Sequence, residues 1–177
     1  ISTYDVWWHL AYGKLIFETA EIPRHDVFSF TAAGAGRTDH EWGFQVLVYG
    51  LHLLGGSAAL IVAKALWLAF IALLVHRFAT REAGLSPAAA ALALVPFALA
   101  GHGRYVLRPE ILSLGFAVIL ATALFRRRAS PATVRDLWWI PGLFAVWANV
   151  HGGLIVGVVI LALVLAGRTI ELAWGRW

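Results

Sequence analysis

The sequence of 177 residues contains no cysteine, which excludes disulfide bonds and metal sites built from thiolates. Methionine is also absent, even from position 1, so we expect this chain to be a processed product or the ordered part of a longer protein. Charged residues make up only 14% of the chain, whereas an ordinary soluble domain has about 25%. This scarcity of charge argues against a soluble domain and predicts a membrane protein.

Hydrophobic residues account for 60% of the chain, and they gather in runs that suit a lipid bilayer. A helix needs about 20 apolar residues to cross a membrane, and residues 57–75 approach that length. Shorter apolar runs follow at residues 87–100, 110–125, 137–150 and 154–166. The sequence therefore predicts an all-α fold, a polytopic transmembrane bundle of about five apolar helices.

The N-terminal part of the chain has a different character, because aromatic and charged side chains are interleaved there. Residues 4–17 include two tryptophans, which prefer the headgroup level of a bilayer. Residues 42–54 have a second amphipathic pattern, which a pair of glycines ends. We therefore expect residues 1–56 to form an interfacial loop with two amphipathic helices, followed by the helical bundle at residues 57–177.

The distribution of charge predicts an orientation. If the N-terminal segment lies outside and the loops alternate, the inner loops collect arginines, including those at residues 126–128, and the outer side collects acids. This arrangement satisfies the positive-inside rule. It also places three polar clusters, residues 39–41, 102–110 and 149–151, on the outer face. The net charge of +4 is no nucleic-acid signature, because the arginines lie in short loops between apolar runs.

Acidic residues near the first long apolar run could carry chemistry. Two of Asp5, Asp39 and Glu41 could bind a divalent cation, with His40 or His151 as a further ligand, or one could act as a general base. No metal-ligand spacing motif such as HExxH is present. The alternative interpretation is a helix N-cap at Asp39 or the residue before it, with the other charges in water.

Further polar residues stand at the ends of the later apolar runs. Arg104 and Arg108 are four residues apart, so on a helix they would share a face and could clamp a phosphate. Their alternative role is pairing with Glu110 and with lipid phosphates. Asn149 and His151 end a membrane run, where polar side chains are costly unless they are used or satisfied. Their alternative role is a hydrogen bond between helices.

Several motifs resemble one family of membrane enzymes. They are Asp5-Val-Trp-Trp-His9-Leu, Pro23-Arg-His-Asp26-Val-Phe-Ser-Phe-Thr31, Asp39-His-Glu41-Trp, Leu107-Arg-Pro-Glu110 and Trp147-Ala-Asn-Val-His151-Gly-Gly. From residue 5 to about residue 167, the chain resembles the N-terminal half of bacterial polytopic glycosyltransferases of the GT-C type. That superfamily includes the protein mannosyltransferases and the aminoarabinose transferases of lipid A. The family's preceding first helix, its later helices and its C-terminal domain are not in this sequence.

The family moves a sugar from a polyprenyl-phosphate carrier to an acceptor at the outer membrane face. The resemblance implies that Asp5 and Glu41 act as base or as ligands of a divalent metal ion, with Asp39 as a further catalytic candidate. It also implies that Arg104 and Arg108 face the carrier phosphate, and that the polar cluster faces the periplasm from the bacterial inner membrane. The expected substrate-binding residues are His9, His40, His102, Arg104, Arg108, Glu110, Asn149 and His151.

The alternative function is that of a non-catalytic subunit of a larger membrane assembly, such as a respiratory or light-harvesting complex. The aromatic N-terminal segment and the apolar helices would then pack against other subunits, and histidines could ligate pigments. The acids and arginines favour the enzyme, and the family's missing helices favour the subunit. The expected partners are membrane lipids, together with a polyprenyl-phosphate sugar for the enzyme or other membrane subunits for the structural protein.

Overall fold

The computed structural model describes residues 5–101, 105–126 and 137–175 of the chain. Over these residues the fold is helical and contains no strand longer than an isolated bridge. The predicted all-α class is therefore confirmed. The helices are α1 (Asp5–Thr19), α2 (Trp42–Arg81), α3 (Pro87–Ala100), α4 (Glu110–Arg126), α5 (Trp139–Val150) and α6 (Leu154–Trp174).

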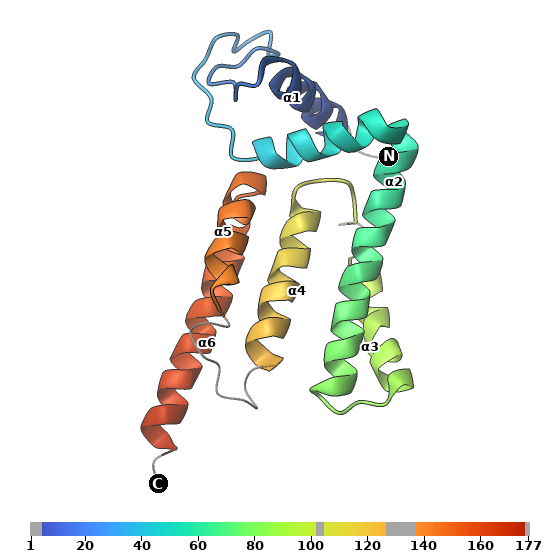
Figure 1. The fold of residues 1–177 in the computed structure, drawn as a ribbon, viewed down its shortest axis with the longest axis vertical. Helices are drawn as coiled ribbons and strands as arrows, with labels where there is room; N and C mark the ends of the chain where they lie inside the picture. The colour runs from blue at the N-terminus through green and yellow to red at the C-terminus, as the bar shows by residue number, and fades with distance from the viewer. Residues whose placement is uncertain (1–4, 102–104, 127–136, 176–177) are drawn as a thin grey trace.

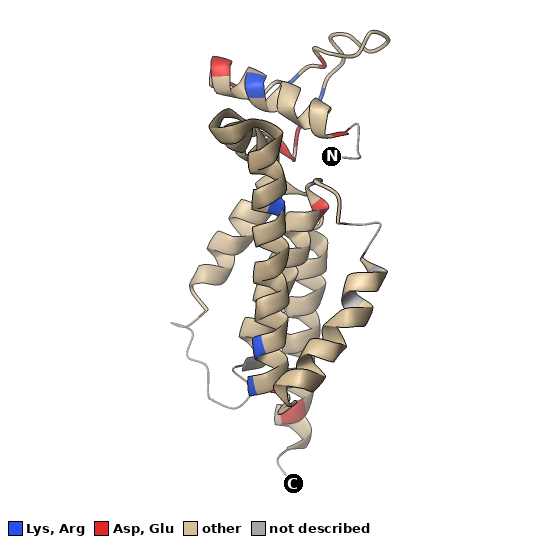
Figure 2. Ribbon diagram, turned by 90° about the vertical axis from the view of Figure 1, so that its right-hand side faces the viewer, with Lys and Arg blue, Asp and Glu red and all other residues tan. Residues whose placement is uncertain are grey.

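Two layers are visible in the arrangement of the helices. The long second part of α2 runs beside α3 and α4, and α4 in turn packs against α5 and α6 (Figure 1). Helix α1 and the first part of α2 lie across one end of this bundle, and the view turned by 90° shows the same crossing (Figure 2). The polar N-terminal segment is thus a separate layer that covers one end of the apolar helices.

A pair of glycines divides α2 into its two parts. Gly55 has φ −170° and ψ 28°, and Gly56 has φ 58° and ψ −146°, so both lie outside helical geometry. A side chain at Gly56 would be strained, because L-residues rarely adopt that positive φ. The chain turns here from the N-terminal layer into the bundle (Figure 1). The predicted end of the second amphipathic helix at this pair is confirmed.

The other helix boundaries follow the apolar runs closely, except that α2 continues past residue 75 to Arg81 and α6 also ends later than predicted. Helix α3 begins and ends where the sequence predicts, and α4 and α5 do so within two residues. Helix α6 extends past its predicted end at residue 166 to Trp174. An i,i+3 ion pair supports this polar extension, since Arg168 Nη1 lies 3.4 Å from Glu171 Oε2.

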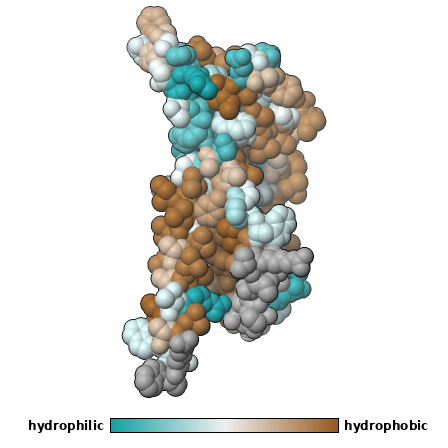
Figure 3. Space-filling model, turned by 60° about the vertical axis from the view of Figure 1, so that its left-hand side comes forward, coloured by the Kyte–Doolittle hydropathy of each residue, from teal (hydrophilic) through white to brown (hydrophobic). Residues whose placement is uncertain are grey.

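Two helices, α2 and α6, are long and apolar enough to cross a membrane. Only 11% and 6% of their most apolar windows are buried inside the structure, so their apolar side chains face outward. The face drawn in Figure 3 shows the same pattern, with hydrophobic residues over much of the bundle and hydrophilic ones gathered toward its ends. Helices α3, α4 and α5 have 14, 17 and 12 residues. They measure about 18–26 Å at 1.5 Å per residue, so a bundle of about five spanning helices stays a prediction.

A buried apolar cluster joins the two layers. It consists of Val6 and Leu10 of α1, Phe44 and Val48 of the first part of α2, Leu60 of the second part, and Val150 of α5. Helices α1 and α2 approach each other closely at Gly13, where a Cβ atom would lie 2.2 Å from the Gln45 carbonyl oxygen. The N-terminal layer is therefore packed onto the bundle, and its side chains have fixed positions above the ends of α4 and α5.

Candidate functional site

A cavity of about 280 Å³ lies where α1 meets the starts of α2 and α4. Acidic residues lie along the ribbon in this region, between α1 and the bundle (Figure 2). Five residues that the sequence predicts as site residues share the cavity, although they come from three separate parts of the chain. The lining consists of Asp5, Trp8, His9, Glu41, Arg108, Pro109 and Glu110.

Three acids of the cavity stand at the beginnings of helices. Asp5 is the first residue of α1, Glu110 is the first residue of α4, and Glu41 is the N-cap residue of α2. A carboxylate at a helix N-terminus is stabilised by the positive end of the helix dipole. The fold therefore brings the starts of three helices, each with an acidic side chain, to one cavity.

An ion pair crosses the cavity between Arg108 and Asp5. Arg108 Nη2 contacts Asp5 Oδ2, and the side chains are 42% and 48% exposed. Arg108 Nε is buried and has no hydrogen-bond partner among the described residues. One edge of the guanidinium is therefore engaged by a carboxylate, and its Nε donor is unused.

The shared helix face of Arg104 and Arg108 required both residues to be helical, and that condition is not met at Arg108; their joint role in binding a phosphate stays a prediction. Arg108 lies in a non-helical segment directly before α4. The reason is Pro109, because proline disfavours helical geometry at the residue that precedes it. Arg104 and His102, both predicted to bind substrate, lie outside the described residues.

Glu41 has the surroundings of a carboxyl group that can exchange a proton. Burial raises the pKa of Glu41 above its ordinary value, and positive charge on nearby His40 and His151 opposes that rise. His40 Nε2 lies 3.8 Å from Glu41 Oε1, and the His40 side chain is 61% exposed. A carboxyl with a raised pKa, in a cavity and beside histidines, is suited to general acid–base chemistry.

His9 lies against the apolar core at the base of the cavity. It is 6% exposed, and its ring packs edge-on against Phe44 with 5.0 Å between the ring centroids. Burial lowers the pKa of His9, so the neutral ring is favoured. His9 Nδ1 is buried and has no hydrogen-bond partner among the described residues.

Asp39 does not line the cavity, although it is only two residues from Glu41. Its side chain is 2% exposed and accepts hydrogen bonds from Arg37 Nη2 at 3.2 Å and Gln45 Nε2 at 2.9 Å. The Glu41 amide donates to Asp39 Oδ1 at 3.0 Å. Asp39 thus holds the turn before α2 and positions Glu41, which is itself the N-cap residue. A catalytic role for Asp39 stays a prediction.

Asn149 joins α5 to the N-terminal layer. The Trp42 indole N–H donates to Asn149 Oδ1 at 2.8 Å, and Asn149 Nδ2 donates to the Ala145 carbonyl at 2.8 Å. Gly43 approaches the same point closely, since a Cβ there would lie 2.7 Å from the Asn149 carbonyl oxygen. Asn149 therefore makes the contact between helices that its alternative interpretation predicts, and it does not line the cavity.

His151 belongs to a buried network that joins α4, α5 and the turn before α6. The Gly153 amide donates to His151 Nδ1 at 3.1 Å, so this nitrogen is a hydrogen-bond acceptor. Ser113 Oγ lies 2.8 Å from the same nitrogen and accepts the Trp147 indole N–H at 2.7 Å. This network satisfies Nδ1 of His151, and His151 lies outside the cavity lining.

Some residues at the site were not expected from the sequence. Trp8 lines the cavity, whereas its residue type alone indicates the membrane interface. The Arg37 guanidinium carbon lies 4.1 Å from the centroid of the Tyr12 ring, and the same guanidinium binds Asp39. No local sequence pattern predicts this contact. Ser113 did leave a signal, because a polar residue inside an apolar run requires a hydrogen-bond partner.

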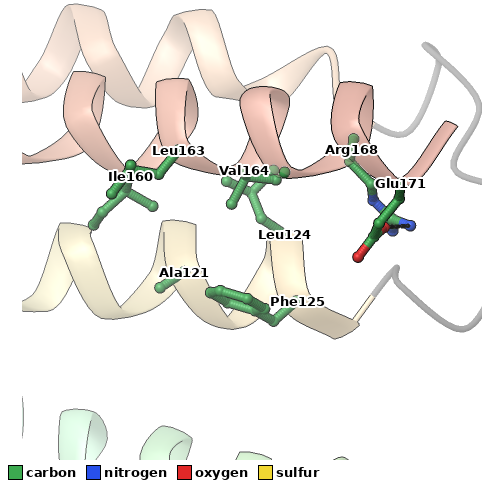
Figure 4. Close-up of a pocket in the computed structure, with 9 residues that line it drawn as sticks. Ala121, Leu124, Phe125, Ile160, Leu163, Val164, Arg168 and Glu171 are labelled. Carbon is green, nitrogen blue, oxygen red and sulfur yellow. Dashed lines mark hydrogen bonds and ion pairs between the residues drawn. The ribbon is translucent and has the colours of Figure 1, made fainter. Parts of the chain in front are cut away.

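A second cavity, of about 220 Å³, lies between α4 and α6 near their C-terminal ends. Side chains from both helices line it, and most are apolar (Figure 4). Arg168 and Glu171 form its polar end. None of the predicted site residues that the structure describes lines this cavity, and the C-terminal ends of α4 and α6 lie toward the other end of the bundle from α1 (Figure 1).

A metal site on Asp5 and Glu41 stays a prediction. Both residues line the cavity, but the Asp5 carboxylate is already bound by Arg108. In the part of the chain that the structure describes, no group of three or more His, Cys, Asp or Glu side chains is arranged to hold a metal ion. None of the chemistry proposed below passes through a metal.

Comparison of the chain with protein-family models, with curated protein sequences and with solved structures gives no match. The function is therefore argued from the cavity itself.

Proposed function

We propose that this chain belongs to a membrane glycosyltransferase of the GT-C type, which takes its sugar from a polyprenyl-phosphate carrier at the outer membrane face. One observation carries the proposal: Asp5, Glu41, Arg108 and Glu110 line a single cavity at one end of a bundle of apolar helices. Two of those helices are long and apolar enough to cross a membrane. A lipid-linked phosphate and a water-soluble acceptor would meet at such a boundary.

The reaction would use the cavity residues as follows. Glu41 takes the proton of the acceptor hydroxyl, whose oxygen then forms a bond to C1 of the sugar. The bond between C1 and the carrier phosphate oxygen breaks, and its electron pair leaves on the phosphate. Arg108 neutralises the charge that develops on that phosphate, for which a guanidinium is well suited. The raised pKa of Glu41 favours it over Asp5 as the base.

The position of the cavity supports a lipid-linked donor. The cavity lies between the polar N-terminal layer and the apolar bundle, so a prenyl chain could stay beside the helices while its phosphate reaches Arg108. Basic residues Arg77 and Arg81 lie at the opposite end of α2. By the positive-inside rule, this charge distribution supports an outward-facing cavity, and the family resemblance supports the bacterial inner membrane.

The test is turnover by the complete protein in liposomes. Polyprenyl-phosphate mannose and polyprenyl-phosphate aminoarabinose serve as donors, and release of polyprenyl phosphate is measured. We expect Glu41→Gln to lower the rate by about 10²- to 10⁴-fold, the usual contribution of a general base. Glu18→Gln is the matched control, because Glu18 lies on α1 in an exposed pair with Lys14. Full activity in both Asp5→Asn and Glu41→Gln would contradict the mechanism.

A non-catalytic membrane subunit is the second candidate. The outward apolar surface of α6 favours it, since only 6% of the helix's most apolar window is buried. Such a surface suits neighbouring subunits as well as lipid. The subunit hypothesis predicts normal assembly for the two carboxamide variants and no release of polyprenyl phosphate by the unaltered protein.

A further inference from the structure

We propose that the ion pair between Asp5 and Arg108 is a latch that the carrier phosphate opens. In the closed state described here, Asp5 occupies one edge of the Arg108 guanidinium. An incoming phosphate takes the guanidinium, and the released Asp5 carboxylate can then accept a hydrogen bond from the acceptor hydroxyl. This inference rests on the proposed function and adds to it a step in which donor binding prepares the site for the acceptor.

The geometry of Arg108 makes such an exchange possible. Its side chain faces the cavity and is 42% exposed, so a ligand can reach it. Its Nε donor is buried and unpartnered among the described residues, although the Asp5 carboxylate is in contact with Nη2. A phosphate presents more oxygens than a carboxylate does, so it can replace Asp5 on the guanidinium and accept from more than one of its N–H groups.

The ion pair between Arg37 and Asp39, in the same region, is an example of a well-supported contact with a buried carboxylate. The Asp39 carboxylate is 2% exposed and also accepts hydrogen bonds from Gln45 and from the Glu41 amide. Asp5 has no comparable supporting hydrogen bonds among the described residues, and half of its side chain is exposed. A half-exposed ion pair is weak, so a competing anion can displace it.

The latch makes a prediction that a simple phosphate-binding site does not make. If Asp5 competes with the phosphate for Arg108, then Asp5→Asn should tighten binding of a prenyl phosphate by about two- to fivefold. If Asp5 instead helps to hold the donor, for example through a cation, then the same substitution should weaken binding. The direction of the change therefore separates the two arrangements.

The experiment measures binding of farnesyl phosphate to the full protein in phosphatidylcholine nanodiscs. Glu110→Gln is the matched control, since it removes one negative charge from the same cavity without touching the contact with Arg108. We expect Asp5→Asn to tighten binding more than Glu110→Gln does. In an Arg108→Gln background, Asp5→Asn should not tighten the binding of farnesyl phosphate any further. In the native background, Asp5→Asn should leave the binding of farnesol, which has no phosphate, unchanged.

The outcomes distinguish the latch from the function on which it rests. If Asp5→Asn weakens the binding of farnesyl phosphate, or tightens it no more than Glu110→Gln does, the latch is wrong. The glycosyltransferase proposal would still stand. Binding of phosphatidylglycerol is measured in the same way. If Asp5→Asn tightens it as much as it tightens the binding of farnesyl phosphate, Arg108 binds lipid headgroups and the carrier phosphate is not its ligand. Unaltered protein that binds no farnesyl phosphate would overturn both proposals.

Discussion

Asp39 and Glu41 show how different the surroundings of two neighbouring acids can be. The Asp39 carboxylate is enclosed by Arg37 and Gln45, whereas Glu41 lines the cavity and its pKa is raised by burial. Their positions in the sequence do not separate these roles, because they do not show that Arg37, which lies over the Tyr12 ring of α1, also binds Asp39. The sequence could identify the group of acids, but it could not say which of them faces the cavity.

The raised pKa of Glu41 predicts a pH dependence. A general base acts in its ionised form, so kcat/KM should increase with pH, with a midpoint above the ordinary value of 4.5. The folded protein favours the protonated form of Glu41. This form therefore stabilises the fold at low pH, and the stabilisation is lost as the pH rises through the raised pKa of Glu41. A pH–rate profile of the complete protein would show this rise.

Two variants provide the controls for this pH profile. Glu41→Asp should keep the rise in kcat/KM, because a carboxyl group remains, and Glu41→Gln should lose it along with most of the rate. An unchanged rise in Glu41→Gln would assign the titration to another group and remove the case for Glu41 as the base.

At the scale of the helices, the apolar runs and the glycine breaks predicted most of the fold. The end of the first part of α2 at Gly55 and both ends of α3 were found correctly, because local backbone preferences and hydrophobicity decide them. The extension of α6 to Trp174 was missed, since it contains polar residues. The spacing of Arg104 and Arg108 places them on one face only in a helix, and Pro109 keeps Arg108 outside α4.

The network around Ser113 predicts how α4 and α5 are held together. Ser113→Ala would leave the buried Trp147 indole N–H without its acceptor and would remove a partner from His151. An unsatisfied buried donor costs about 1–3 kcal/mol, so we expect the thermal midpoint of the purified protein to fall clearly. Thermal unfolding, followed by tryptophan fluorescence, measures the change.

Thr122→Ala is the matched control for Ser113→Ala on the same helix. The Thr122 hydroxyl donates to the carbonyls of Val118 and Ile119 in its own helix, so its loss breaks no contact between helices. Its effect on the thermal midpoint should be small. If the two variants unfold at the same temperature, the buried network does not stabilise the packing of α4 against α5.

At the scale of the whole molecule, the two ends of the bundle differ in chemistry. One end is covered by α1 and the first part of α2 and holds the acidic cavity, and the other holds the basic C-terminal end of α2 (Figures 1 and 2). The apolar surface between them has few buried residues along α2 and α6. By the positive-inside rule, this distribution of charge predicts that the basic end of the bundle faces the cytoplasm and the acidic cavity faces outward.

The orientation can be tested because the chain has no cysteine of its own. We expect Ala35→Cys, in the loop between α1 and α2, to react with a membrane-impermeant maleimide added to intact cells. Arg81→Cys, at the far end of α2, should react only after the membrane is permeabilised. Both positions are solvent-accessible in the structure, so a silent cysteine reports the membrane rather than burial. If Arg81→Cys is labelled in intact cells and Ala35→Cys is not, the orientation is the reverse of the predicted one. The acidic cavity would then lie at the cytoplasmic face, where the proposed outward-facing transfer could not occur.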